Sequence, residues 1–230
     1  MRAWWFRANG DRRGTVIYLH GIADNRGSSV RIAEHFVPMG FDVVAYDSRA
    51  HGQSTGSACS YGVHEKRDLM RVMDQVDHVA QGPIVVLGTS LGAAVALQAA
   101  AADERIAAVV SVATFSDLRT VVAERAPFFA SRNNVAQAFA IAERDAAFNV
   151  DEASPVAAAP NIRAPVLVIH GARDSETPPE HSRRVFAALK SEKRLVVVPD
   201  AGHNDCLKPA VWREIDAWLV AALAKGRAPS

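Results

Sequence analysis

Short continuous apolar segments alternate along the chain with longer segments in which apolar residues recur at helical spacing. The first kind predicts β-strands that are buried on both faces, and the second predicts amphipathic helices. Strands are expected at residues 3–7, 15–20, 41–46, 83–87, 106–112, 165–169 and 195–198, and helices at 26–38, 63–79, 91–102, 179–189 and 209–223. This alternation predicts one α/β domain over residues 1–230, with a mainly parallel twisted sheet and helices on both of its faces.

Residues 116–163 interrupt the alternation, because they separate two expected strands by more residues than one crossover helix needs. Helical patterns cover residues 118–124 and 135–148, and a turn-rich stretch follows at 151–160. Insertions of this size in compact α/β domains are usually functional lids. The segment is therefore expected to form a small helical cap, and a longer crossover with no role in binding is the alternative.

Composition and charge limit the classes of protein to which the chain can belong. The 230 residues are 49% hydrophobic, and 26 Lys and Arg against 25 Asp and Glu give a formal net charge of +1. This balance does not favour a nucleic-acid-binding protein. Residues 1–14 lack the apolar segment of a signal peptide, and the longest apolar stretch, residues 93–102, is too short to span a bilayer. A cytoplasmic protein is expected, while a longer natural N-terminus with an anchor and the oligomeric state stay open.

The segment at residues 88–92, GTSLG, fits the pattern G-x-S-x-G. It directly follows an expected strand and opens an expected helix, which is the context in which a sharp turn presents its serine at the sheet edge. The N–H groups at the start of the helix can stabilise a developing oxyanion. Ser90 is therefore interpreted as a nucleophile, with a purely structural Gly-Ser turn as the alternative.

A serine hydroxyl becomes an effective nucleophile only when a base removes its proton. His203 is the best-placed histidine, because it lies in AGHND at residues 201–205, between the last expected strand and the last helix. Loops that follow parallel strands share one edge of the sheet, so His203 can reach Ser90. His20 and His170 are expected to pack structurally, and His51, His64, His78 and His181 are expected to be solvated.

Asp174 follows the strand expected at residues 165–169 and is the favoured orienting carboxylate. It gives the order nucleophile, acid, histidine along the chain, which G-x-S-x-G hydrolases require. Glu176 can substitute for it, whereas Asp200 and Asp205 are weaker because they flank the histidine on its own strand. No metal-ligand spacing and no dinucleotide-binding loop occur, so neither a metal nor a cofactor is expected. Cys59 and Cys206 are interpreted as buried or incidental thiols.

Together these segments resemble the α/β-hydrolase family over almost the whole chain. Four signatures occur in the family's order: His20-Gly21 after a strand, GTSLG, GARDSETPP at residues 171–179, and AGHND. Residues 46–54, YDSRAHGQS, also resemble a family loop, with Ala50 in place of the common glycine. The resemblance implies an oxyanion hole formed by the backbone N–H groups of Ile22 and Leu91.

The expected function is that of a serine hydrolase acting on a small-molecule acyl substrate. Serine at residue 90 argues against dehalogenase and epoxide hydrolase members, which carry aspartate there. Phe115, Phe128 and Phe129 in the inserted segment are expected to line an apolar acyl pocket, or else to seat the cap on the core. The loops resemble small esterases and lysophospholipases most, which predicts cleavage of carboxylic esters or thioesters with small to medium, largely apolar acyl groups. Peptidase or amidase, C–C hydrolase and acyltransferase chemistry are alternatives, as is a non-catalytic binding protein.

Overall fold

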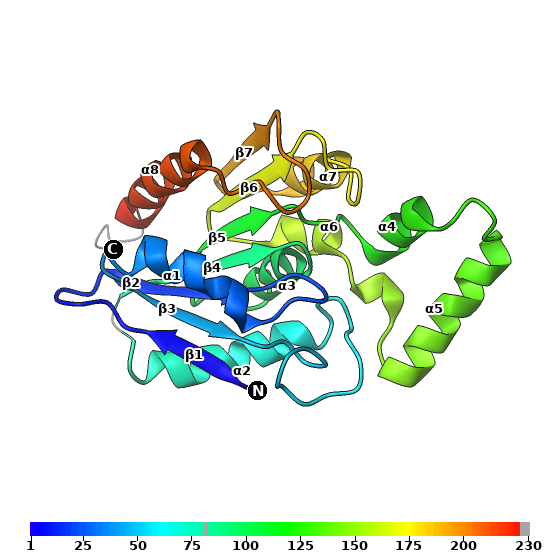
Figure 1. Ribbon diagram of the computed structural model, residues 1–230, viewed down its shortest axis with the longest axis horizontal. Coiled ribbons are helices and arrows are strands. Elements are labelled where there is room, and N and C mark those ends of the chain that lie inside the picture. The colour runs from blue at the N-terminus through cyan, green and yellow to red at the C-terminus, as the bar shows by residue number, and fades with distance from the viewer. Residues whose placement is uncertain (81, 226–230) are drawn as a thin grey trace.

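The computed structural model describes residues 1–80 and 82–225 (Figure 1). Within them the strands are β1 (Ala3–Phe6), β2 (Gly14–Leu19), β3 (Phe41–Tyr46), β4 (Ile84–Thr89), β5 (Ile106–Val112), β6 (Val166–Gly171) and β7 (Lys193–Val198). They form one sheet in the order β1-β3-β2-β4-β5-β6-β7. Only the pairing of β1 with β3 is antiparallel among these strands, so the predicted mainly parallel sheet is confirmed.

Helices cover both faces of the sheet, as predicted (Figure 1). One face carries α1 (Val30–Phe36) and α8 (Pro209–Lys225), and the other carries α2 (Glu65–Asp77), α3 (Leu91–Ala100), α6 (Pro155–Ala158) and α7 (Glu180–Ala188). Short 3-10 turns occur at Arg26–Ser29, Val150–Glu152 and Ala159–Asn161. No helix in the described part of the chain combines the length and the apolar character needed to cross a membrane.

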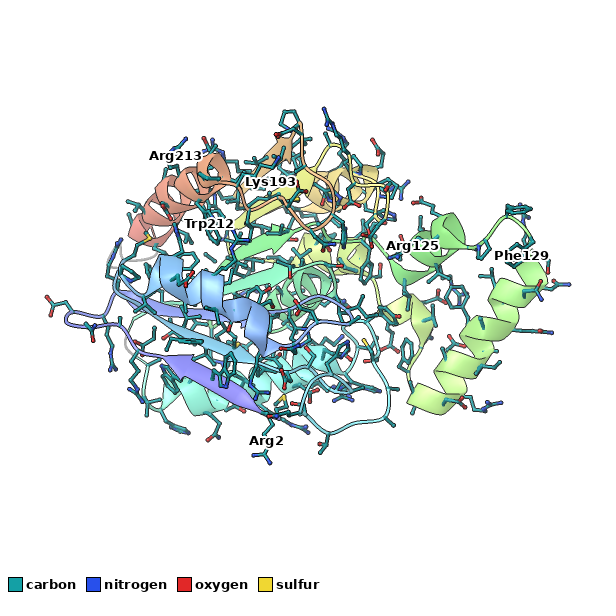
Figure 2. The ribbon with its side chains drawn as sticks, viewed as in Figure 1. Arg2, Arg125, Phe129, Lys193, Trp212 and Arg213 are labelled. Atoms are coloured by element: carbon teal, nitrogen blue, oxygen red, sulfur yellow. The ribbon has the colours of Figure 1, made fainter. Side chains whose placement is uncertain are left out.

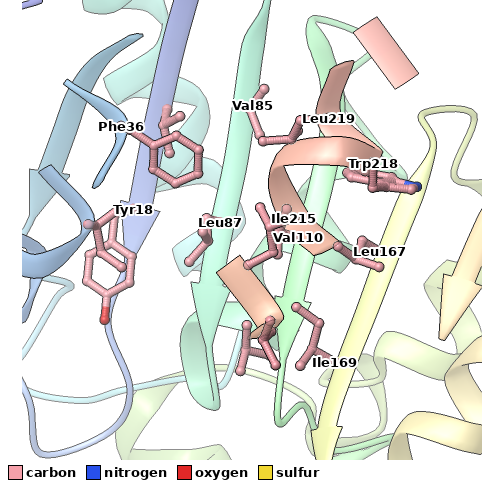
Figure 3. Packing of buried hydrophobic residues seen from close by; sticks show 14 of the residues in the cluster. Tyr18, Phe36, Val85, Leu87, Val110, Leu167, Ile169, Ile215, Trp218 and Leu219 are labelled. Carbon is pink, nitrogen blue, oxygen red and sulfur yellow. The ribbon is translucent and has the colours of Figure 1, made fainter. Parts of the chain in front are cut away.

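The core consists of strand side chains packed against these helices. Figure 3 shows Ile215 and Trp218 of α8 beside Leu87 and Leu167 of the central strands. On the opposite face every residue of α3 is buried. Its sequence, LGAAVALQAA, is rich in small side chains, which lets the helix approach the sheet closely. The turn between β4 and α3 therefore stands on a closely packed part of the core.

The segment between β5 and β6 adds two helices, α4 (Leu118–Arg125) and α5 (Arg132–Ala146), beyond the carboxyl edge of the sheet (Figure 1). Their starts are capped by the side chains of Asp117 and Ser131. α5 ends earlier than the apolar pattern predicts, because Ala147 adopts a left-handed conformation with φ 50°. No residue of α5 is fully buried, and the helix rests on a small separate cluster that includes Phe115 and Phe148.

Candidate active site

Ser90 sits in a strained turn between β4 and α3. Its φ is 51° and its ψ is −114°, a conformation that a residue with a side chain adopts only under constraint. The backbone N–H of Ser90 donates to the carbonyl of Val112 at 2.8 Å, which ties the turn to β5. A Cβ atom on Gly88 would overlap the carbonyl of Gly92, and one on Gly92 would overlap that of Leu19. Both glycines of the G-x-S-x-G pattern are therefore required by close backbone packing.

The structure brings Ser90, His203 and Asp174 together from three loops at the carboxyl edge of the sheet. His203 Nε2 lies 2.9 Å from Ser90 Oγ, and His203 Nδ1 lies 2.7 Å from Asp174 Oδ2. The Asp174 side chain is fully buried and that of His203 is 9% exposed. Gly171 lets the last two loops meet, because a Cβ there would overlap the carbonyl of Ala201. The result is one continuous hydrogen-bonded path from hydroxyl to carboxylate.

Asp174 accepts hydrogen bonds on both oxygens. Oδ1 accepts from the backbone N–H groups of Thr177 at 2.8 Å and Glu176 at 3.0 Å, and Oδ2 lies 3.0 Å from His170 Nε2 as well as near His203. Burial alone would raise the pKa of this carboxyl, but the hydrogen bonds from His170, His203 and Thr177 outweigh it and hold the pKa well below its ordinary value. An ionised carboxylate only accepts, so His203 Nδ1 carries the proton and its Nε2 lone pair faces Ser90 Oγ.

His170, which the sequence predicts only to pack structurally, contacts the Asp174 carboxylate. Its ring is completely buried, and Nε2 also lies 2.7 Å from the carbonyl of Thr177. Because both neighbours of Nε2 are acceptors, this nitrogen carries the proton and donates to Asp174. Nδ1 then accepts from the Ser182 hydroxyl at 2.6 Å. The spacing of four residues between His170 and Asp174 is visible in the sequence, yet no general rule assigns a role to it.

The turn after β2 lies beside the nucleophile. A Cβ on Gly21 would stand 3.5 Å from the Cβ of Ser90, which puts the adjacent Ile22 next to the serine. His20 braces this turn, because its Nε2 accepts from the N–H of Ser48 at 3.0 Å and its Nδ1 donates to the Gly21 carbonyl at 2.7 Å. Burial lowers the pKa of His20, which fits this neutral, packed ring. Ile22 itself lines the same two cavities as Ser90.

The other carboxylates considered from the sequence lie away from His203. Glu176 faces Arg125, with Oε2 3.6 Å from Nη2. Asp200 and Asp205 lie 2.8 and 3.7 Å from the Lys208 ammonium. Of the four acidic residues, the structure brings Asp174 alone within hydrogen-bond distance of the imidazole.

Ser90 lies on the walls of two cavities formed by described residues. The first, of about 620 Å³, is mixed in character and includes His203, Arg31, Asp24, Lys208 and Trp212. The second, of about 520 Å³, is mostly apolar and extends between the sheet edge, α4 and α5. Its walls include Ile22, Tyr61, Leu91, Phe115, Leu118, Val121, Val122, Pro127, Ala130, Val135 and Ala138. The serine therefore borders a compartment of mixed polarity and a second, mostly apolar compartment.

The expected pocket residues divide between the cavity and the surface. Phe115 lines the apolar cavity, but Phe128 is 101% exposed and Phe129 is 76% exposed. Neither of these two rings lines either of the two cavities, so that part of the prediction is wrong. Pro127 and Ala130 occupy the inner side of the α4–α5 turn, which leaves the two rings between them on the outer side.

His181 also differs from its expected role. It is completely buried, not solvated: Nδ1 accepts from the N–H of Ser116 at 3.1 Å, and Nε2 lies 2.8 Å from Glu124 Oε2. Burial is the largest influence on its pKa and lowers it. The imidazole thereby joins α7 to the base of the α4–α5 segment. His51 and His64 are half-buried and His78 is exposed.

The two thiols are poor competitors for the role of nucleophile. Burial raises the pKa of Cys206 to about 11 and that of Cys59 to about 12. A thiol with so high a pKa carries almost no thiolate near neutral pH. Within residues 1–80 and 82–225 there is no group of three or more His, Cys, Asp or Glu side chains arranged to hold a metal ion.

Comparisons with known proteins identify the family. The family model described as alpha/beta hydrolase fold matches residues 14–141, and one described as TAP-like protein matches residues 134–228. Protein YqkD of Bacillus subtilis is 30% identical over 200 residues, covering 84% of this chain and 66% of that protein. Protein Rv2307c of Mycobacterium tuberculosis is 30% identical over 204 residues, covering 88% and 67%. The chain belongs to the α/β-hydrolase fold family and spans about two thirds of the length of these relatives.

Solved structures share the same architecture. The Pyrococcus furiosus esterase Pf2001 has a TM-score of 0.75 at 24% identity, over 97% of this chain and 86% of that one. A monoacylglycerol lipase from Paleococcus ferrophilus has a TM-score of 0.71 at 24% identity, over 96% and 98%. An acetyl xylan esterase from Paenibacillus sp. R4 has a TM-score of 0.77 at 20% identity, over 95% and 78%. At these identities the likeness shows a common fold.

Proposed function

We propose that the protein is a serine hydrolase that cleaves carboxylic esters or thioesters through an acyl-enzyme intermediate. The observation that carries the proposal is the geometry at Ser90 Oγ, which lies 2.9 Å from a histidine nitrogen whose lone pair faces it. The buried Asp174 carboxylate fixes that tautomer from the other side of the ring. Nucleophile and base within hydrogen-bond reach, with the base oriented by a third group, are the requirements of covalent acyl transfer.

The reaction follows from these contacts. Ser90 Oγ attacks the acyl carbonyl while His203 Nε2 takes its proton, and the resulting imidazolium is stabilised by Asp174. His203 then gives this proton to the leaving alcohol or thiol, which departs and leaves the acyl group on Ser90. Water then enters and loses a proton to the same nitrogen while its oxygen attacks the acyl carbon. The bond to Ser90 breaks, His203 returns the proton to Ser90 Oγ, and the carboxylic acid leaves.

We assign the oxyanion hole to the backbone N–H groups of Leu91 and Ile22. Leu91 is the first residue of α3, where the N–H groups have no partner within the helix. The close approach of the preceding residue supports the second donor, since a Cβ on Gly21 would stand 3.5 Å from the serine Cβ. Each donor of this kind contributes about 3 kcal/mol to stabilisation of the transition state.

The two cavities suggest where the two parts of a substrate bind. The apolar cavity suits a small to medium acyl chain, and the mixed cavity, with Arg31, Asp24 and Lys208 on its walls, suits the leaving alcohol or thiol. Residues 116–163 act in this proposal as a cap on a single domain, because α4 and α5 supply much of the apolar wall. Arg125 lies on the walls of both cavities and marks their boundary.

Labelling with a fluorophosphonate probe, alongside hydrolysis of p-nitrophenyl esters of increasing chain length, tests the proposal. The parent protein is expected to be labelled and to hydrolyse the short and medium esters. Ser90→Ala should be neither labelled nor able to hydrolyse the esters. Ser57→Ala, at an exposed serine, should be labelled and should hydrolyse the esters as the parent does. Thermal melting checks that each variant is folded. Persistent labelling of folded Ser90→Ala would show that another residue is the nucleophile.

A further inference from the structure

Phe128 and Phe129 form an exposed aromatic pair at the outer end of the molecule. Their ring centroids are 5.5 Å apart in an edge-to-face arrangement. The side chains are 101% and 76% exposed, so both rings lie in solvent. Figure 2 shows Phe129 at the far tip of the α4–α5 segment, with Arg125 nearer to the sheet. Two adjacent large apolar side chains in this position indicate a surface that is covered when the protein acts.

The aromatic pair lies between two residues that line the apolar cavity. The neighbouring residues Pro127 and Ala130 line that cavity, which leads inward to Ser90. The two rings and the cavity therefore occupy opposite sides of one short turn. If the rings contact an apolar surface, an acyl chain that leaves this surface needs to cross only the turn to reach the cavity.

The charge of the turn has one sign. Residues 125–135, RAPFFASRNNV, contain two arginines and no acidic residue. Arg132 is exposed and begins α5, while Arg125 lies 3.6 Å from Glu176 with a side chain that is 51% exposed. Aromatic rings flanked by cations are the combination that binds an anionic lipid surface, where rings enter the apolar layer and cations meet the headgroups.

The size of the patch distinguishes a lipid surface from a protein partner. A stable protein interface buries about 1,000 Å² or more, which two phenylalanine rings on a protruding turn cannot supply. A lipid surface needs only a few inserted side chains together with electrostatic attraction. We propose that the turn at residues 126–132, named here the docking turn, binds the surface of anionic lipid assemblies by inserting Phe128 and Phe129. On this basis acyl substrates enter the apolar cavity from the lipid phase, a consequence that rests on the proposed esterase function.

Co-sedimentation with lipid vesicles tests the docking step without any hydrolysis. The full chain carrying Ser90→Ala is mixed with vesicles of phosphatidylcholine, either alone or mixed with phosphatidylglycerol. We expect binding to the anionic vesicles, weaker binding to the neutral ones, and further weakening as salt is added. Adding Phe128→Ser and Phe129→Ser together should lower the partition coefficient about 100-fold, roughly tenfold for each ring removed from the apolar layer.

Two control variants separate the docking turn from general effects. Val220→Ser removes an exposed apolar side chain, 54% exposed, from α8 at the other end of the molecule and should leave vesicle binding unchanged (Figure 1). Arg132→Gln should weaken binding to anionic vesicles and leave binding to neutral vesicles as it was. The proposal is overturned if the double serine variant binds anionic vesicles as the Ser90→Ala parent does, or if that parent binds none. It is also overturned if the rings instead mediate a dimer, seen as concentration-dependent sedimentation that the double variant abolishes.

Kinetics with the active protein separate this proposal from that of esterase function. With Ser90 intact, the double serine variant should hydrolyse a water-soluble short ester at the parent's rate but should be slower on an ester embedded in anionic vesicles. Equal loss on both substrates would mean that the rings support the site itself and would overturn the docking role. Vesicle binding without hydrolysis of any ester would keep the docking turn and reject the esterase assignment.

Discussion

Replacing Asp174 with asparagine is expected to reverse the hydrogen bond that orients His203. The backbone N–H groups of Thr177 and Glu176 donate to Asp174 Oδ1 at 2.8 and 3.0 Å. Only an oxygen can accept them, so Asp174→Asn must keep its amide oxygen at that position. Its NH₂ group then replaces Oδ2, 2.7 Å from His203 Nδ1, and the N–H of His170 keeps its other acceptor, the Thr177 carbonyl at 2.7 Å.

The tautomer of the imidazole follows from that substitution. An NH₂ group donates, so His203 Nδ1 must accept and the ring proton moves to Nε2. That nitrogen faces Ser90 Oγ at 2.9 Å and can no longer remove the serine proton. Loss of the correct tautomer in a serine triad lowers kcat by about 10,000-fold, or about 5.5 kcal/mol of transition-state stabilisation.

The assay is hydrolysis of a short p-nitrophenyl ester over a series of pH values, with melting temperatures to verify folding. The residual activity of Asp174→Asn should rise with pH, because hydroxide can replace the missing base. The matched control is Asp200→Asn, at the exposed acid that the structure pairs with Lys208, and it should retain the parent's kcat/KM. If folded Asp174→Asn keeps more than about a tenth of the parent's activity, the tautomer argument fails.

Other substitutions probe the supports of the site. His170→Leu removes one hydrogen bond from the buried Asp174 carboxylate, so it should raise the pKa of Asp174 and lower kcat about tenfold in ester kinetics. His170→Gln can still donate to Asp174, so its loss of kcat should be smaller. Gly92→Ala should lower the free energy of unfolding by about 2 kcal/mol or more in urea titrations, because its Cβ overlaps a backbone carbonyl, while Gly202→Ala, with nothing nearer than 3.6 Å, should lose less. Burial lowers the pKa of His181, so at mildly acidic pH the unfolded chain binds a proton that the folded protein does not. The melting temperature should therefore fall as the pH drops from about 7 to 5.5. In His181→Gln this fall should be less steep.

The sequence by itself determined the architecture and the location of the candidate active site. The strands at Phe41–Tyr46 and Ile106–Val112 have the bounds that the sequence predicts, since a strand covered on both faces is apolar at nearly every position. The GTSLG segment predicted the position of the strained turn, because both of its glycines are needed where backbone segments pack too closely for a side chain. The loops of Asp174 and His203 were placed at the same edge because parallel strands align their carboxyl ends.

Only the tertiary structure decided which side chains meet across that edge. The second histidine at Asp174 and the burial of His181 depend on contacts with Thr177, Ser182 and Glu124, whose partners no local pattern reveals. The outward direction of Phe128 and Phe129 depends on how the α4–α5 turn closes over the apolar cavity. Periodicity records whether a residue is apolar and which face of its own element it occupies. Its surroundings are fixed by the packing of distant segments, and these rings lie in a turn that has no face of its own.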